Sequence, residues 1–139
     1  MARRDARDLA MRMIYAEDLG GKLEPLKDGE MPDEENCLIA MDEFDRGYID
    51  RVMAVFRENA AVIDETINGL SSDWSLNRIS KVDLAILRLA CCEIGHMNEV
   101  PLSVAINEAV ELAKKYGTDQ SSRFVNGVLG GYARKLTNA

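Results

Sequence analysis

Apolar residues recur every three or four positions along almost the whole of this 139-residue chain. That spacing lines one face of an α-helix, whereas a half-buried β-strand alternates apolar and polar residues. We find no alternation longer than four residues, and the chain has only three prolines. A chain of this length can bury one hydrophobic core of ordinary size. The sequence therefore predicts an all-α fold, a compact bundle of about six to seven helices in one domain over 1–139.

Glycines, prolines and polar clusters divide this pattern into separate helices. Gly20-Gly21 ends the first helix, and Gly47 indicates a break or kink between the second and third. Residues 84–92 are apolar on nearly all sides, which predicts a central position for the helix that contains them. Expected N-caps are Asp33, Ser75 or Asn77, Ser103, and Thr118 or Asp119. The expected helices cover 3–19, 33–45, 49–70, about 77–94, 103–116 and about 119–136.

The net charge of −7 is concentrated in one segment. From Glu17 to Asp45 there are eleven acidic residues against Lys22 and Lys27, a local charge of −9. The rest of the chain therefore carries −7 − (−9) = +2. The acidic loop and helix at about 22–45 would repel nucleic acid, but a basic surface elsewhere is compatible with this composition.

The residue inventory argues against several classes of protein. The sequence contains no run of about 18 apolar residues, so it predicts no membrane span. The N-terminus also lacks the apolar core of a secretion signal, and we therefore expect a cytoplasmic protein. With His96 as the one histidine we expect no metal site and no catalytic residues. The sequence contains no glycine-rich phosphate loop, so we expect no nucleotide cofactor. Cys91 and Cys92 lie in an apolar helical pattern and are interpreted as buried, inert thiols.

Two short segments have the chemistry of an RNA contact. Arg3, Arg4 and Arg7 crowd the start of the first helix, and arginine forks pair with phosphates or stack on unpaired bases. Residues 121–126, Ser-Ser-Arg-Phe-Val-Asn, follow a helix cap, where free backbone N–H groups can receive a phosphate. The alternatives are a solubilising N-terminal tail, and a Phe124 that belongs to the core with serines that only cap a helix. A groove between the first and last helices would join the two segments.

Several longer runs carry a resemblance to a known family. Residues 106–114 read Ile-Asn-Glu-Ala-Val-Glu-Leu-Ala-Lys, and residues 124–129 read Phe-Val-Asn-Gly-Val-Leu. A third pattern begins at Trp74 and continues through Arg78-Ile79 to Ile86-Leu87-Arg88-Leu89-Ala90. With the N-terminal arginines, these runs span roughly 1–20 and 74–130. The chain closely resembles the NusB family of transcription antitermination factors.

This resemblance implies two packed helical halves, no catalysis and no cofactor. It implies binding of boxA RNA from ribosomal RNA leaders together with the small-subunit ribosomal protein NusE, within the RNA polymerase antitermination complex. The positions that match the family's RNA contacts are Arg3, Arg4, Arg7, Ser122, Arg123 and Phe124. Those that match its NusE contacts are Tyr15, Leu19 and Asp83. A core role for Leu19 is an alternative.

The chain departs from the family pattern at Asp5, which interrupts the arginines, and at Gly130, where an aspartate is common. Two other functions stay open. One is a helical module for ribosomal RNA modification, as in a methyltransferase, which would require a fused catalytic domain. The other is a helical adaptor that binds only proteins. A homodimer that covers the RNA site also stays open.

Overall fold

The structure is a computed structural model that describes residues 4–20, 42–71 and 78–137. These residues form five helices and no strand, which confirms the all-α prediction. The helices are α1 (Arg4–Asp18), α3 (Glu43–Leu70), α4 (Lys81–His96), α5 (Leu102–Tyr116) and α6 (Ser121–Thr137). Five is fewer than the six to seven predicted. Most of the helix expected at 33–45 lies outside the described residues, and its last three positions belong to α3.

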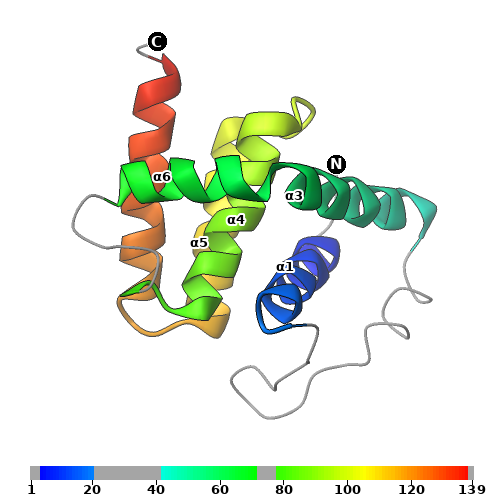
Figure 1. Cartoon of the computed structure of the whole chain (residues 1–139), viewed down its shortest axis with the longest axis horizontal. Helices are drawn as coiled ribbons and strands as arrows, with labels where there is room; N and C mark the ends of the chain where they lie inside the picture. The colour runs from blue at the N-terminus through cyan, green and yellow to red at the C-terminus, as the bar shows by residue number, and fades with distance from the viewer. Residues whose placement is uncertain (1–3, 21–41, 72–77, 138–139) are drawn as a thin grey trace.

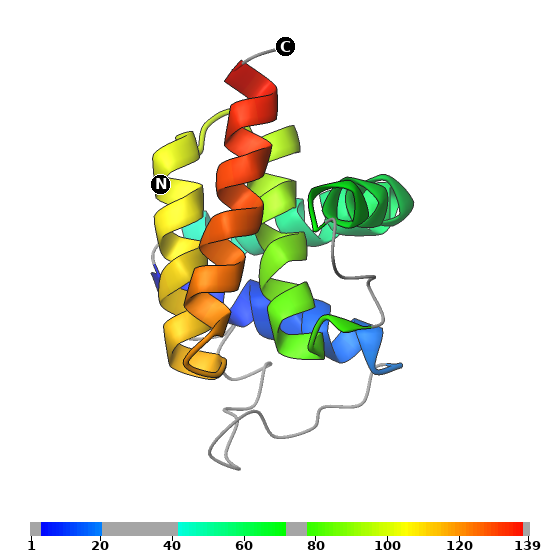
Figure 2. The same cartoon turned by 90° about the vertical axis from the view of Figure 1, so that its left-hand side faces the viewer.

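Helix α4 lies at the centre, as its apolar composition predicts. It packs against each of the other four helices, while α1 also contacts α3 and α5 also contacts α6. Figure 1 shows α3 crossing over α4, and Figure 2 shows α4, α5 and α6 running side by side. Residues 83–93 of α4 are all buried. An amphipathic helix needs one covered face, whereas a helix that is apolar all round requires neighbours on every side.

Helix α3 is longer than the sequence predicts. Asp42 caps it by accepting a hydrogen bond from the Asp45 backbone N–H at 2.9 Å, and Gly47 lies inside the helix instead of breaking it. The non-helical residue is Asn59, with φ −123° and ψ 16°. Its side-chain amide donates to the Val55 carbonyl at 2.9 Å, the bond with which a polar side chain competes with the helix backbone.

Two predicted caps are also displaced along the chain. Ser80, and not Ser75 or Asn77, caps α4 by accepting a hydrogen bond from the Asp83 N–H at 3.1 Å. Helix α5 starts directly after Pro101, ahead of the expected Ser103. Proline suits a helix start because its φ, here −61°, is fixed and it lacks the N–H that would be unpaired there. Within the described residues, no helix combines the length and the apolarity needed to cross a membrane.

The interpretation of Cys91 and Cys92 as buried thiols is confirmed, since both are at most 2% exposed. Burial raises the pKa of each thiol to about 12. The folded chain therefore holds both protons at pH 9 to 12, where the unfolded chain has released them, and its free energy of unfolding must fall as the pH rises through that range.

We expect each thiol to contribute a loss of about 1 kcal/mol between pH 9 and pH 10. Urea denaturation of the reduced protein at several pH values measures the slope. A variant with Cys91→Ala and Cys92→Ala is the matched control, because other titrating groups are unchanged in it. Equal slopes for the two proteins would contradict the burial of the thiols.

Candidate functional site

The arginines at the start of α1 have different environments. The Arg7 side chain is only 3% exposed and lies against Glu93 of α4, with 3.0 Å between Nη2 and Oε2. Its Nε also donates to both Glu93 oxygens, at 3.0 and 3.3 Å. The Arg4 side chain is 73% exposed. Arg4 is therefore a surface residue, while Arg7 joins α1 to the central helix. Arg3 lies outside the described residues.

The burial of Arg7 shifts the pKa values around it. Its guanidinium lies over the Tyr48 ring of α3, 5.6 Å from the centroid. Desolvation raises the pKa of Glu93, and the hydrogen bond and charge of Arg7 oppose this rise. Burial alone would lower the pKa of Arg7, but Glu93 raises it overall. Direct contact between Arg7 and RNA would require this side chain to leave Glu93 and reach the surface.

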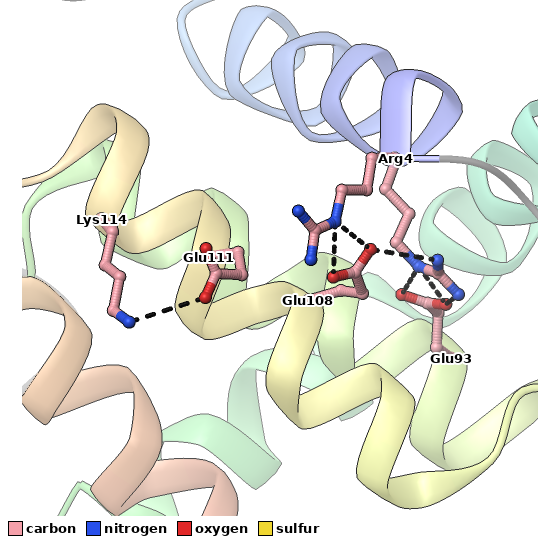
Figure 3. A network of polar contacts seen from close by, with 6 residues as sticks. Arg4, Glu93, Glu108, Glu111 and Lys114 are labelled. Carbon is pink, nitrogen blue, oxygen red and sulfur yellow. Dashed lines mark hydrogen bonds and ion pairs between the residues drawn. The ribbon is translucent and has the colours of Figure 1, made fainter.

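Glu108 of α5 holds the exposed arginine in place. The Arg4 Nε donates to both Glu108 oxygens at 3.1 Å, and the two residues face each other across α1 and α5 in Figure 3. Glu108 also lies 3.8 Å from Arg7 Nη1. Since Arg4 uses its Nε for Glu108, its terminal nitrogens stay available on a largely exposed side chain.

A first groove of about 270 Å³ runs between α1 and α5. Further along it, Lys115 donates to Asp8 Oδ2 and the Tyr116 hydroxyl donates to Asp8 Oδ1, both at 2.5 Å. The Lys115 side chain is 61% exposed, so part of its charge faces solvent. The groove is lined by Arg4, Asp5, Arg7, Asp8, Glu108, Glu111, Leu112 and Lys115.

A second groove of about 470 Å³ lies where α4 and α6 begin. The Ser121 hydroxyl donates to Asp83 Oδ2 at 3.1 Å and accepts from the Thr118 N–H at 2.9 Å, which fixes the two helix starts together. The residues that line the groove are Arg78, Ile79, Ser80, Asp83, Thr118, Gln120, Ser121, Arg123 and Phe124.

The predicted residues of the 121–126 segment divide between this groove and the core. Arg123 is exposed and lines the groove, Phe124 is half-buried and packs against the core, and Ser122 is half-buried. The N–H groups of Ser121 and Phe124 donate to Thr118 and Gln120 carbonyls. These two N–H groups are therefore not free for a phosphate, contrary to the sequence-based expectation for this segment.

The expected groove between the first and last helices is replaced by two separate grooves. The arginines of α1 lie over α5, and Arg123 lies beside α4. Residues Tyr116 to Gln120 join the first groove to the second, because α5 ends at the α1 contact and α6 begins at the α4 contact. The two predicted segments thus lie along one connected surface.

The residues predicted to contact a partner protein come from α1 and α4. Tyr15 and Leu19 are half-buried at the end of α1, and Asp83 is buried at the start of α4. Asp18 brings these helix ends together, since its carboxylate lies 3.3 Å from Lys81 and 3.2 Å from Arg88. Asp83 Oδ1 is buried and has no hydrogen-bond donor among the described residues.

Sequence reasoning missed two basic residues that line these grooves, Arg78 and Lys115. Arg78 precedes the α4 cap and is exposed. A signal was present in both cases: Arg78 stands in the run that begins at Trp74, and Lys115 follows the run 106–114. Neither position could be assigned to a groove without the packing of the helices.

Comparison with known proteins agrees with this fold. A profile of the NusB family matches residues 4–134. A transcription antitermination protein NusB of Acetivibrio thermocellus is 50% identical over 133 residues, covering 94% of this chain and 87% of the relative. One of Clostridium botulinum is 40% identical over 140 residues, covering 94% and 98% of the two chains.

Solved structures give the same result. A T. maritima NusB has a TM-score of 0.78 and 32% identity, covering 96% of this chain and 93% of that one. A chain from a crystal structure of antitermination factors NusB and NusE with double-stranded RNA has a TM-score of 0.77 at 24% identity, with 96% of each chain covered, and shows the shared fold. The match to the profile over nearly the whole length, with relatives of 40 to 50% identity, places this chain in the NusB family.

Proposed function

We propose that this protein is a non-catalytic transcription antitermination factor that binds boxA RNA together with NusE and joins the RNA polymerase elongation complex in the cytoplasm. The observation that carries the proposal is the connected surface of two grooves with exposed arginines, Arg4 on the first and Arg123 on the second. Relatives that are 40 to 50% identical to this chain are named transcription antitermination proteins. A chain of the same fold occurs in a complex with NusE and RNA.

On this surface the exposed arginines bind phosphates and Phe124 offers a stacking face. Guanidinium groups pair with phosphate oxygens through paired N–H donors, and unpaired bases stack on aromatic rings. Ser122 adds a hydroxyl donor beside Arg123. Arg3, directly before Arg4 in the sequence, would extend the basic surface, while Arg7 acts by holding α1 against α4 through Glu93.

NusE binding is proposed at the joined ends of α1 and α4. Tyr15 and Leu19 offer half-exposed apolar surface there. Asp83 Oδ1 is an acceptor without a donor among the described residues, and a donor from NusE would satisfy it. Because Asp83 also lines the second groove, the RNA and NusE surfaces adjoin, which supports cooperative binding of the two partners.

The test is a titration of boxA RNA, with and without NusE, at several salt concentrations. We expect tighter binding with NusE. The combined variant Arg4→Ala/Arg123→Ala should weaken binding and reduce the slope of log affinity against log salt by about 2, which corresponds to two lost phosphate contacts.

The matched control is Arg134→Ala, because Arg134 is exposed on α6 but lines neither groove. If the protein is an adaptor that binds only proteins, neither the unchanged protein nor any variant should bind RNA, with or without NusE. RNA binding that is equal with and without NusE, and unchanged in the double variant, would overturn the proposed function.

A further inference from the structure

Most arginines of this protein already have a carboxylate partner. Among the described residues, ion pairs with acidic side chains are made by Arg4, Arg7, Arg12, Arg51, Arg57 and Arg88. Arg78 and Arg123 make no such pair with any described residue, although both are exposed. Arg134 in α6 also makes no such pair with a described residue, but it lines neither groove, whereas Arg78 and Arg123 both line the groove where α4 and α6 begin.

These two arginines line the same groove from different elements. Arg123 belongs to the first turn of α6, and Arg78 lies just before α4. The backbone on each side is fixed by buried neighbours. Ile79, next to Arg78, is 6% exposed, and Ser121, two residues before Arg123, is 3% exposed and bonded to Asp83. The groove therefore presents two guanidinium groups from a rigid base.

The chemistry of the groove fits the backbone of an unpaired RNA strand. Two guanidinium groups without carboxylate partners attract an anion that can accept hydrogen bonds from several N–H groups. A phosphate group is such an anion, because its oxygens each accept hydrogen bonds. Phe124 lies in the same groove and is half-buried, which leaves part of its ring for a base next to that phosphate.

We propose that Arg78 is a further RNA-binding residue, which with Arg123 holds one phosphate group of the RNA strand in the groove between α4 and α6. This inference rests on the proposed function, because it assigns a residue to the same RNA surface. We assign the groove to RNA. The alternative ligand is an acidic surface of a protein partner, and the test must distinguish the two.

The test compares boxA RNA binding by Arg78→Ala, Arg78→Lys and Arg134→Ala. We expect Arg78→Ala to weaken binding on the order of tenfold and to reduce the salt slope by about 1. Arg78→Lys should recover the slope but only part of the affinity, because lysine keeps the charge and loses the planar fork. Arg134→Ala should bind as the unchanged protein does. Thermal unfolding should be nearly unchanged in all three, since Arg78 is exposed and makes no ion pair with a described residue.

A double-mutant cycle tests whether the two arginines hold the same phosphate. If they do, Arg78→Ala combined with Arg123→Ala should cost less than the sum of the single losses. Strictly additive losses would contradict a shared phosphate.

Two further outcomes separate this inference from the proposed function. If Arg78→Ala binds RNA normally while Arg4→Ala/Arg123→Ala is weakened, the inference about Arg78 fails and the proposed function stands. If Arg78→Ala loses NusE and keeps RNA, the groove belongs to a protein partner and the inference is overturned. If no variant changes RNA binding, both fail together.

Discussion

Replacing Arg7 with alanine is expected to lower the free energy of unfolding by about 3 to 5 kcal/mol. Arg7 and Glu93 are both nearly inaccessible to solvent, and Glu93 lies in the last turn of the central helix α4. Removing the guanidinium leaves the Glu93 carboxylate buried with its main partner gone, and the cost is the desolvation of that charge. Arg7 also covers the Tyr48 ring, so packing is lost as well.

Two matched variants identify the cause of this loss. Arg51→Ala removes an exposed ion pair with Glu99 and should cost less than about 1 kcal/mol. Replacing both partners by apolar residues, Arg7→Met with Glu93→Leu, should recover much of the stability because no charge remains buried. Urea denaturation measures all three variants. A loss for Arg7→Ala as small as that of Arg51→Ala would refute the buried ion pair.

Replacing Arg88 with alanine is the second large effect, about 2 to 3 kcal/mol of unfolding free energy. Arg88 Nε and Nη2 donate to the two oxygens of Asp64 in α3, each at 2.9 Å, and Nη1 lies 3.2 Å from Asp18 in α1. One arginine on the central helix thus joins two others. The expected loss is smaller than for Arg7 because Asp64 is 28% exposed and water compensates part of its charge.

Arg57 is the control for Arg88, since it also joins α1 and α3 but at the surface, through Glu17. Arg57→Ala should cost less than about 1 kcal/mol. Arg88→Ala should in addition weaken NusE binding, because Asp18 then keeps only its more exposed pair with Lys81, and the end of α1 that carries Tyr15 and Leu19 is held less firmly. Unfolding free energies from urea denaturation, with NusE affinity measured below the denaturation range, separate the two effects. Similar losses of stability for Arg57→Ala and Arg88→Ala would be evidence against this assignment.

Local sequence determined the kind of fold and the chemistry available on its surface. The three-to-four spacing of apolar residues specifies which face of each helix is covered, and the apolar run 84–92 specifies that α4 is covered on all sides. Those properties depend only on near neighbours in the chain, so they could be predicted. The basic start of α1 and the Arg123-Phe124 pair could be identified for the same reason, by residue type.

The tertiary structure decided which of these residues face solvent. Arg4 and Arg7 are equivalent in local sequence, but Arg7 is buried because Glu93, 86 positions away, lies opposite it on α4. Asn59 and not Gly47 interrupts α3, because glycine is tolerated within a long packed helix whereas the Asn59 amide bonds to the backbone. Arg78 joins Arg123 only because α4 and α6 begin side by side. A pattern with a period of 3.6 residues predicts that one face of a helix is covered, but it does not predict which helix covers it. Contacts between residues far apart in the sequence, such as Arg7 with Glu93, depend on which helices pack together.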